Sequence, residues 1–224
     1  MKTRAAGGLD GISVSDVEVE SYSVTLPGVL SLPKDPKGLV VFAHGSGSSR
    51  LSPRNTYVAT VLHEASLGTL LFDLLTSRED EVYDNRFDVD LLAERLAAAT
   101  EWLHGQDGLA GLDVGYFGAS TGAAAALQAS ARRQDIRAIV SRGGRPDLAR
   151  DYLDRVEAPT LLIVGGSDDR AVLEFNERAL GRLNRGGKKV NELVIIPGAT
   201  HLFEEPGALE EVARVATKWF LRFL

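Results

Sequence analysis

A serine with glycines two positions to either side is the first feature of this sequence that could do chemistry. The Gly-x-Ser-x-Gly motif of residues 118–122 lies between an apolar run at 113–117 and an alanine-rich run at 121–131. The first run predicts a strand and the second a helix, so Ser120 would lie in a sharp turn between them. In such a nucleophile elbow, glycines let the two backbones approach and the serine is strained and exposed. A glycine-rich turn with Ser120 as an ordinary N-cap is the alternative.

Polar residues follow two later apolar runs. Asp168 and Asp169 come after the run at 160–164, and His201 comes after the run at 193–196. A serine hydroxyl is a weak nucleophile until an imidazole takes its proton, and a buried carboxylate fixes the tautomer of that imidazole. Successive residues point in different directions, so only one of the two aspartates can face the histidine. We therefore predict a triad of Ser120, one of these aspartates and His201.

The other three histidines have simpler interpretations. His63 and His104 fall on predicted helices, where surface or capping roles suffice. His44 follows a strand, but the glycine-rich turn after it predicts a structural imidazole. His201 is therefore the predicted general base.

A developing negative charge on a substrate oxygen needs preorganised donors. The backbone amide of Thr121, at the start of the predicted helix, is one expected donor. The other is expected from the small, flexible residues at 44–49, and we predict the amide of Ser46. Taken alone, that segment is an ordinary turn.

The elements that must position these residues alternate along the chain. Residues 13–32 show the period-two pattern of antiparallel strands with one solvated face. Buried strands and amphipathic helices then alternate, which predicts a doubly wound, mostly parallel sheet in a single α/β domain spanning residues 1–224. The segment between the strands near residues 140 and 160 is too short for a large lid domain. The predicted strands lie at 39–43, 69–72, 113–117, 136–140, 160–164 and 193–196, with helices near 57–65, 89–103, 121–131, 172–183 and 209–223.

Composition narrows the classes of function. The 224 residues carry a formal charge of −6, the basic residues are scattered, and there is no cysteine. Nucleic acid and anionic membranes are therefore poor partners, and thiolate catalysis and disulfides are excluded. The first residues lead into no apolar signal segment, and no apolar run reaches a membrane span. We expect a cytoplasmic protein with a small-molecule substrate, and the sequence does not predict its oligomeric state.

Two features near the expected site allow alternative interpretations. Residues 74–87 form the longest stretch without periodicity, which could cover part of the site or be a solvated loop. Arg50, Arg54 and Arg142 follow strand ends and could rim the pocket, where a guanidinium binds carboxylates as a fork. Alternatively, these arginines pair with surface aspartates and glutamates.

The motif at 118–122, Asp169, the run Gly198-Ala199-Thr200-His201 and the run His44-Gly45-Ser46-Gly47 together resemble an α/β-hydrolase of the dienelactone hydrolase-like branch. The resemblance covers roughly residues 38–222, and it includes the chain order Ser, Asp, His. Dienelactone hydrolases carry a cysteine nucleophile, whereas this chain has Ser120, and haloalkane dehalogenases carry an aspartate there. Residues 48–50 and 141–145 resemble relatives that are sometimes fused to phosphoribosyltransferases, and we expect no such domain within these 224 residues.

The resemblance also bears on the choice of acid. In relatives, the catalytic aspartate lies three residues after the glycine that closes its strand, shortly before an apolar residue. Counting from Gly166 gives Asp169, with Val172 after it, whereas counting from Gly165 gives Asp168. We predict Asp169.

The expected activity is that of a serine hydrolase that cleaves a small ester, thioester or lactone through an acyl-enzyme, with no metal or organic cofactor. Two alternatives stay open at this point. The fold could serve as a binding protein without turnover. The acyl group could also pass to an alcohol or to peroxide in place of water.

Overall fold

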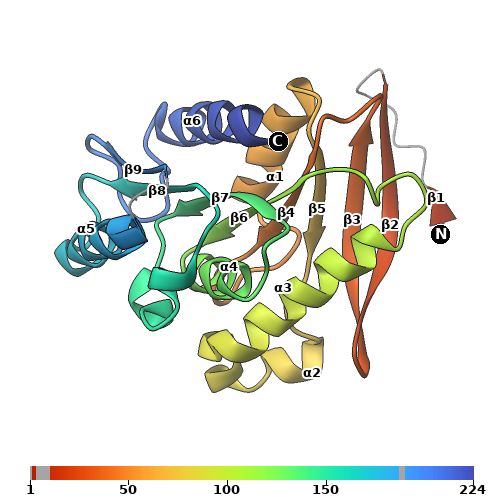
Figure 1. The fold of residues 1–224 in the computed structure, drawn as a ribbon, viewed down its shortest axis with the longest axis horizontal. Helices are drawn as coiled ribbons and strands as arrows, with labels where there is room; N and C mark the ends of the chain where they lie inside the picture. The colour runs from red at the N-terminus through yellow and green to blue at the C-terminus, as the bar shows by residue number, and fades with distance from the viewer. Residues whose placement is uncertain (1, 4–10, 187–189) are drawn as a thin grey trace.

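The computed structural model describes residues 2–3, 11–186 and 190–224, and a single mixed sheet runs through them (Figure 1). Its strands lie in the order β1-β2-β3-β5-β4-β6-β7-β8-β9. Strands β1 to β3 pair antiparallel at one edge, and β3 pairs antiparallel with β5; from β5 to β9 all neighbours are parallel. The bounds are β1 (Lys2–Thr3), β2 (Ile12–Ser21), β3 (Val24–Pro33), β4 (Leu39–Ala43), β5 (Gly68–Phe72), β6 (Val114–Ala119), β7 (Ile136–Arg142), β8 (Thr160–Gly165) and β9 (Asn191–Ile196). This is the mostly parallel sheet with antiparallel N-terminal strands that the sequence predicts.

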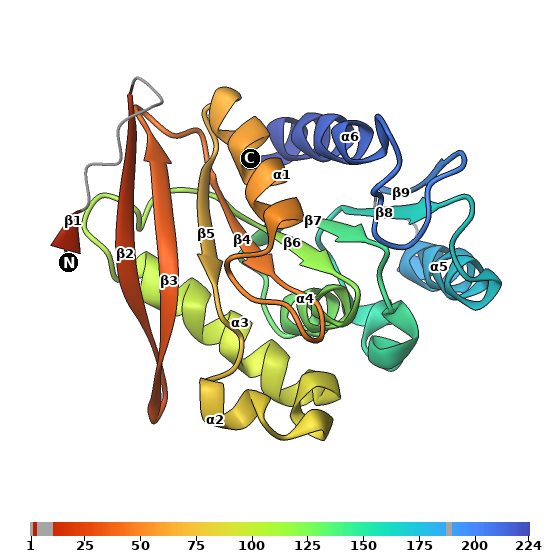
Figure 2. The ribbon, with the colours of Figure 1, turned by 180° about the vertical axis from the view of Figure 1, so that it is seen from behind.

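Helices cover both faces of the sheet (Figures 1 and 2). Helices α1 and α6 pack together on one face, and α3, α4 and α5 lie on the other. Because both faces are covered, every residue of β4, β5, β6 and β8 is buried, which explains their continuous apolar runs. The helices are α1 (Pro53–Glu64), α2 (Ser77–Asp80), α3 (Val89–His104), α4 (Thr121–Ala131), α5 (Arg170–Leu183) and α6 (Ala208–Phe223).

The segment between β5 and α3 is more regular than its sequence suggests. It contains the short helix α2 and a 3-10 helix, η1 (Tyr83–Phe87). Helix α2 starts with a capping box, in which Thr76 and Glu79 satisfy each other's backbone amides. That Thr-x-x-Glu spacing is visible in the sequence and could have predicted the helix. Asp80 and Arg86 of this segment meet residues 44–47 at a small crevice.

The segment between β7 and β8 holds two short 3-10 helices, η2 (Pro146–Ala149) and η3 (Leu153–Arg155). Residues 143–159, all of which the structure describes, contain no lid domain.

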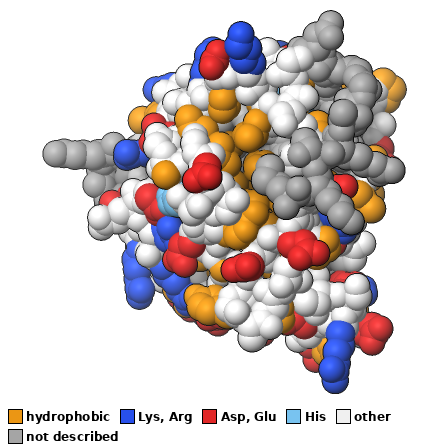
Figure 3. All heavy atoms as spheres, turned by 90° about the vertical axis from the view of Figure 1, so that its right-hand side faces the viewer, with side chains coloured by type: hydrophobic (Ala, Val, Ile, Leu, Met, Phe, Trp, Pro, Cys, Tyr) orange, Lys and Arg blue, Asp and Glu red, His pale blue; other side chains and the backbone are white. Residues whose placement is uncertain are grey.

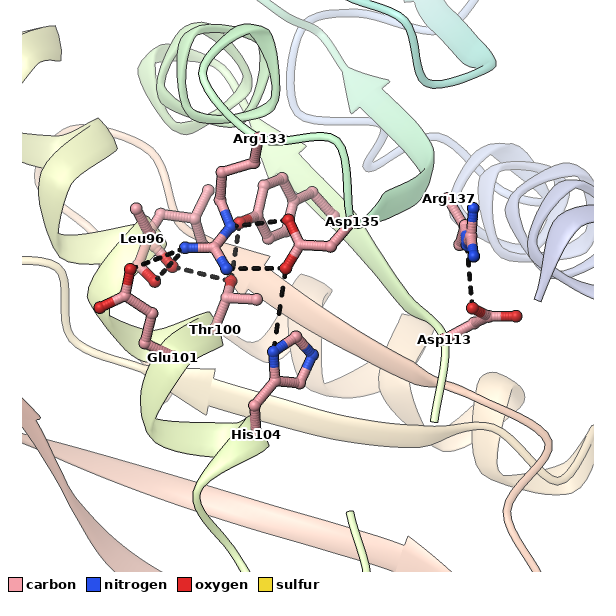
Figure 4. Close-up of polar contacts among 10 residues, drawn as sticks. Leu96, Thr100, Glu101, His104, Asp113, Arg133, Asp135 and Arg137 are labelled. Atoms are coloured by element: carbon pink, nitrogen blue, oxygen red, sulfur yellow. Dashed lines mark hydrogen bonds and ion pairs between the residues drawn. The ribbon is translucent and has the colours of Figure 1, made fainter. Parts of the chain in front are cut away.

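Ion pairs brace the amino ends of β6 and β7, away from the elbow (Figure 4). Arg133 bonds both oxygens of Asp135, at 2.9 and 2.7 Å, and reaches Glu101 on α3 at 3.0 Å. Nearby, the buried hydroxyl of Tyr116 in β6 bonds Thr100 of α3 at 2.7 Å. These contacts fix α3 against β6, the strand that leads into Ser120.

The surface features agree with the composition. On the face shown in Figure 3, acidic and basic side chains are interspersed. Within the described ranges, no helix has the length and apolar character needed to cross a membrane.

Candidate active site

Ser120 occupies the turn from β6 into α4, as the motif predicts. Its φ of 51° and ψ of −118° lie in a region that residues other than glycine rarely adopt. The Ser120 amide donates to the carbonyl of Arg142 at 3.1 Å, and its carbonyl accepts from the amides of Ala123 and Arg145 at 3.1 Å each. Three backbone bonds therefore hold the strained residue in place.

The two glycines of the motif are required by close backbone contacts. A Cβ atom on Gly118 would lie 2.4 Å from the Cα of Ala123, and one on Gly122 would lie 2.2 Å from the carbonyl oxygen of Ala43. Both neighbours are backbone atoms that cannot rotate away. The elbow thus brings α4 against β4 at a distance that only glycine allows.

We expect Gly122→Ala to lower the free energy of unfolding by about 3 kcal/mol or more, because the added methyl group overlaps the β4 backbone. Chemical denaturation measures this directly. The matched control is Gly181→Ala in α5, where an added Cβ has no atom within 4 Å. That control should be neutral or up to about 1 kcal/mol more stable, since alanine is the better helix former. Equal stabilities for the two variants would contradict the close contact.

The structure brings a carboxylate and an imidazole together at the carboxyl ends of β8 and β9. Nδ1 of His201 lies 2.9 Å from Oδ2 of Asp168, whose side chain is 2 % exposed. The other oxygen of Asp168 accepts the amide of Asp169 at 2.7 Å. A carboxylate at Nδ1 holds the proton there and leaves the lone pair at Nε2, the arrangement that a general base needs.

The prediction of Asp169 as the carboxylate facing His201 is wrong by one residue. Asp169 is the N-cap of α5, and its Oδ1 accepts the amide of Ala171 at 2.8 Å. Strand β8 ends at Gly165, so the three-residue count starts there and reaches Asp168. Gly166 lies outside the strand, in the turn. The sequence did not distinguish the two adjacent glycines, so the count started one residue too late.

The loops that carry the acid and the base are bonded to each other. The amide of Gly166 donates to the carbonyl of Ile196 at 2.8 Å, and the amide of Ser167 donates to that of Ala199 at 2.9 Å. A Cβ on Gly165 would lie 2.3 Å from the Ala199 oxygen, so this approach also requires glycine. The two loops form one backbone unit that sets the position of the imidazole.

Gly143, which our sequence analysis did not single out, packs against the ring of His201. A Cβ there would lie 3.4 Å from both Cε1 and Nδ1 of the imidazole, and its φ is 52°. A side chain at this position would strain the backbone, because φ is positive, and would contact the imidazole. The pair Gly143-Gly144 after a predicted strand end was the available signal.

Ser120 and His201 line two cavities that meet at them. One cavity, of about 450 Å³, is also lined by Arg145, Val172 and the two aspartates. The other, of about 160 Å³, extends toward α1 and Arg142. Within the described residues, Ser120 and His201 are not hydrogen-bonded to each other; such contacts are often long until a substrate binds.

The two expected oxyanion donors are adjacent. The Ser46 amide lies 2.9 Å from Oγ1 of Thr121, to which it donates, and the Thr121 backbone amide is at the N-terminus of α4. A substrate oxygen would therefore share the Ser46 donor with the Thr121 hydroxyl, or take it after that side chain rotates. This side-chain contact was not anticipated from the sequence.

His44 is held by backbone atoms at both ring nitrogens. Its Nδ1 lies 3.0 Å from the carbonyl of Gly45, and its Nε2 lies 3.0 Å from the amide of Leu74, which donates to it. Burial lowers the pKa of His44, so the ring is neutral. His44 thus ties the predicted oxyanion loop to the segment after β5 and has no nitrogen left for a substrate.

The three arginines differ in their partners. Arg50 donates to Asp73 through both its backbone amide and its guanidinium, and Arg54 pairs with Glu204 at 2.8 Å. Arg50 and Arg54 therefore pair with acidic side chains, as the alternative interpretation of the sequence predicts. Arg142 is 7 % exposed, and its Nε and Nη1 have no partner in the part of the chain that the structure describes. Arg54 and Arg142, but not Arg50, line the smaller cavity.

No group of three or more histidine, cysteine, aspartate or glutamate side chains within the described ranges could hold a metal ion.

A solved structure decides the family. The chain is 53 % identical to dienelactone hydrolase from Anabaena variabilis. The match covers 95 % of this chain and 99 % of that one, and the two structures superpose with a TM-score of 0.90. The chain belongs to the dienelactone hydrolase family of α/β-hydrolases. Est1E from Butyrivibrio proteoclasticus, at 17 % identity and a TM-score of 0.77 over 92 % of this chain and 98 % of its own, shares the fold. The resemblance in the sequence is thereby confirmed.

Two further comparisons match parts of longer proteins. A Mycobacterium tuberculosis protein named "Putative phosphoribosyl transferase" is 57 % identical over 210 residues, which is 93 % of this chain and 46 % of that protein. This chain therefore spans about half the length of that curated relative. The family model for the prolyl oligopeptidase family matches residues 147–224, which include Asp168 and His201 but not Ser120.

Proposed function

We propose that this dienelactone hydrolase family member is a serine hydrolase that cleaves a small ester, thioester or lactone through an acyl-enzyme. The observation that carries the proposal is the hydrogen bond between the buried Asp168 carboxylate and Nδ1 of His201, beside a serine on a strained elbow. The nucleophile, the base and the acid come from three different strand ends, in the chain order of this fold.

Each residue has a defined part in the proposed reaction. His201 Nε2 takes the Ser120 proton as the hydroxyl oxygen attacks the carbonyl carbon, and Asp168 stabilises the resulting imidazolium. The Thr121 and Ser46 amides stabilise the oxyanion. The imidazolium then gives its proton to the leaving group, and water repeats the two steps to release the acid. The scheme uses no metal or organic cofactor.

Family membership supports a substrate with an ester or lactone bond. The name of the Anabaena variabilis relative describes a hydrolase of a lactone. The phosphoribosyl transferase name belongs to a protein about twice as long as the matching region, so we do not transfer that activity. A small-molecule substrate and a cytoplasmic location stay predictions, as does the absence of nucleic-acid and membrane partners.

A fluorophosphonate probe should label the protein at Ser120, because the probe reacts only with a serine activated by a base. Mass spectrometry of the digested adduct identifies the site. Ser120→Ala should abolish the label, and Asp169→Asn is the control that should keep it. An unlabelled native protein would favour the alternative of a binding protein without turnover.

Acyl transfer to an alcohol or to peroxide uses the same acyl-enzyme and differs only in the acceptor. Product analysis with competing acceptors separates these reactions from hydrolysis. Water should be the dominant acceptor, since the 450 Å³ cavity beside His201 is open to solvent.

A further inference from the structure

The guanidinium of Arg142 is a buried charge without a counterion in the described structure. The residue is 7 % exposed, and two of its three nitrogens, Nε and Nη1, make no hydrogen bond there. Burying a charge is costly unless an opposite charge or hydrogen-bond acceptors compensate. The ring of Phe203, 5.9 Å from the guanidinium carbon, offers only a cation–π contact.

The position of Arg142 explains where a counterion would come from. Arg142 ends β7, where its backbone carbonyl accepts the amide of Ser120. Its side chain lines the 160 Å³ cavity whose wall also includes Ser120 and His201. An anion bonded to Arg142 would therefore lie in the same cavity as the nucleophile.

Other features of this cavity are also positive. Helix α1, twelve residues long, begins at its wall with Ser52 as N-cap, and its first turn contains no acidic residue. No acidic side chain in its first turn therefore compensates the positive end of the helix dipole, and the uncharged Ser52 hydroxyl caps the amide of Asn55. Arg54, in the same first turn, adds a second cation; its partner Glu204 is 64 % exposed. The cavity wall thus carries one arginine that is paired and one that is not paired within the described residues, in a chain whose net charge is −6.

The charge on Arg142 persists at neutral pH. Burial, and then repulsion from Arg54, lower the pKa of Arg142 to about 10. An anion in the cavity would oppose both effects, because an opposite charge stabilises the charged guanidinium.

We infer that this cavity is the subsite for an anionic group of the substrate, a carboxylate or a phosphate, held by Arg142 with help from Arg54 and the N-terminus of α1. The inference rests on the proposed function and specifies its substrate class. A volume of about 160 Å³ is well below the roughly 300 to 1,000 Å³ of a site for a whole drug-sized ligand. The rest of the substrate would occupy the larger cavity on the other side of Ser120.

Asn55 refines the expected ligand. Asn55 also lines this cavity, and its Oδ1 is buried and has no hydrogen-bond donor within the described structure. A hydroxyl group next to the anion, or a water molecule bound with it, would satisfy this acceptor.

Anion binding tests the subsite without turnover. Inorganic phosphate and succinate, each at about ten times its Kd, should raise the Tm of the native protein by about 4 °C. Arg142→Met should lose this rise, and Arg142→Lys should keep part of it, since lysine retains the charge but not the fork. The matched control is Arg137→Met, which removes one exposed positive charge at the other end of the sheet (Figure 4) and should keep the full rise.

Ester substrates test the same subsite during catalysis and identify the anion. We would compare p-nitrophenyl esters with a terminal carboxylate, acetate esters of phosphate-bearing alcohols, and a neutral analogue of each, which is the carboxamide for the carboxylate series and the dimethyl phosphate ester for the phosphate series. The native protein should favour one anionic series about 10- to 100-fold in kcat/KM, the range of a charge-assisted hydrogen bond. Arg142→Met should reduce that ratio to about one, while Arg137→Met preserves it.

Some results would overturn the inference. Equal anion stabilisation in the native protein and Arg142→Met would do so, as would a loss of stability in Arg142→Met with no change in anion binding, which indicates a purely structural arginine. If Arg142→Met does not fold, Arg54→Met tests the same cavity, and this variant should show a smaller rise in Tm with the anions than the native protein. Labelling of Ser120 tests the proposed function independently, so the two proposals can fail separately.

Discussion

Ser120→Ala is expected to lower kcat by about 10⁴- to 10⁶-fold, because the acyl-enzyme can no longer form. The loss should be in turnover alone. The three backbone bonds that hold residue 120 do not involve its hydroxyl group, so the fold stays intact. Hydrolysis of p-nitrophenyl esters gives kcat, and circular dichroism with thermal unfolding reports the fold.

This measurement requires that no other esterase activity is present in the sample. Contamination by an esterase of the expression host must be measured with an unrelated protein that is expressed and purified in the same way. Native-like turnover in the purified Ser120→Ala variant would exclude Ser120 as the nucleophile. A folded variant that binds but does not turn over its substrate would support the triad.

Asp168→Asn should lower kcat by about 10⁴-fold, whereas Asp169→Asn should leave it within about threefold of the native value. The amide keeps the size of the Asp168 side chain but can present an N–H to Nδ1 of His201, which favours the wrong tautomer. Asparagine caps a helix about as well as aspartate, so Asp169→Asn keeps the start of α5. Steady-state kinetics of the two variants, measured side by side, check this.

The comparison is sensitive because the two residues are neighbours with the same charge. Each variant removes one negative charge from the same turn, so general electrostatics cannot distinguish them. If Asp169→Asn were the inactive variant, the hydrogen bond between Asp168 and His201 would not be the catalytic one. Two mildly affected variants would place the acid on another strand.

The sequence predicted the scaffold well because the scaffold follows from local patterns. The alternation of buried strands and amphipathic helices required a parallel sheet, and parallel strands place their carboxyl ends along one edge. Ser120 and His201 were predicted as site residues because each follows a strand. Both positions survive an error of one residue in the strand boundaries.

The sequence could not predict features that depend on the exact residue at which a strand ends or on contacts between distant residues. Choosing between Asp168 and Asp169 required knowing whether β8 ends at Gly165 or Gly166, a difference fixed by the contact of Gly165 with Ala199. The pairing of Arg50 with Asp73 and of Arg54 with Glu204 joins residues 23 and 150 positions apart. No local pattern encodes such contacts, and the isolation of Arg142 becomes visible only once they are known.

The placement of the acid and base at the last two strands has a consequence for how the protein loses activity. Strand β9 is the edge of the sheet, and five of its six residues are incompletely buried. The bonds that join its loop to the loop of Asp168 are therefore carried by the least protected strand of the parallel region. Local opening of an edge strand needs less free energy than global unfolding. Inactivation by heat or denaturant would then begin as fraying of β9, which displaces His201 while the central strands and Ser120 remain folded.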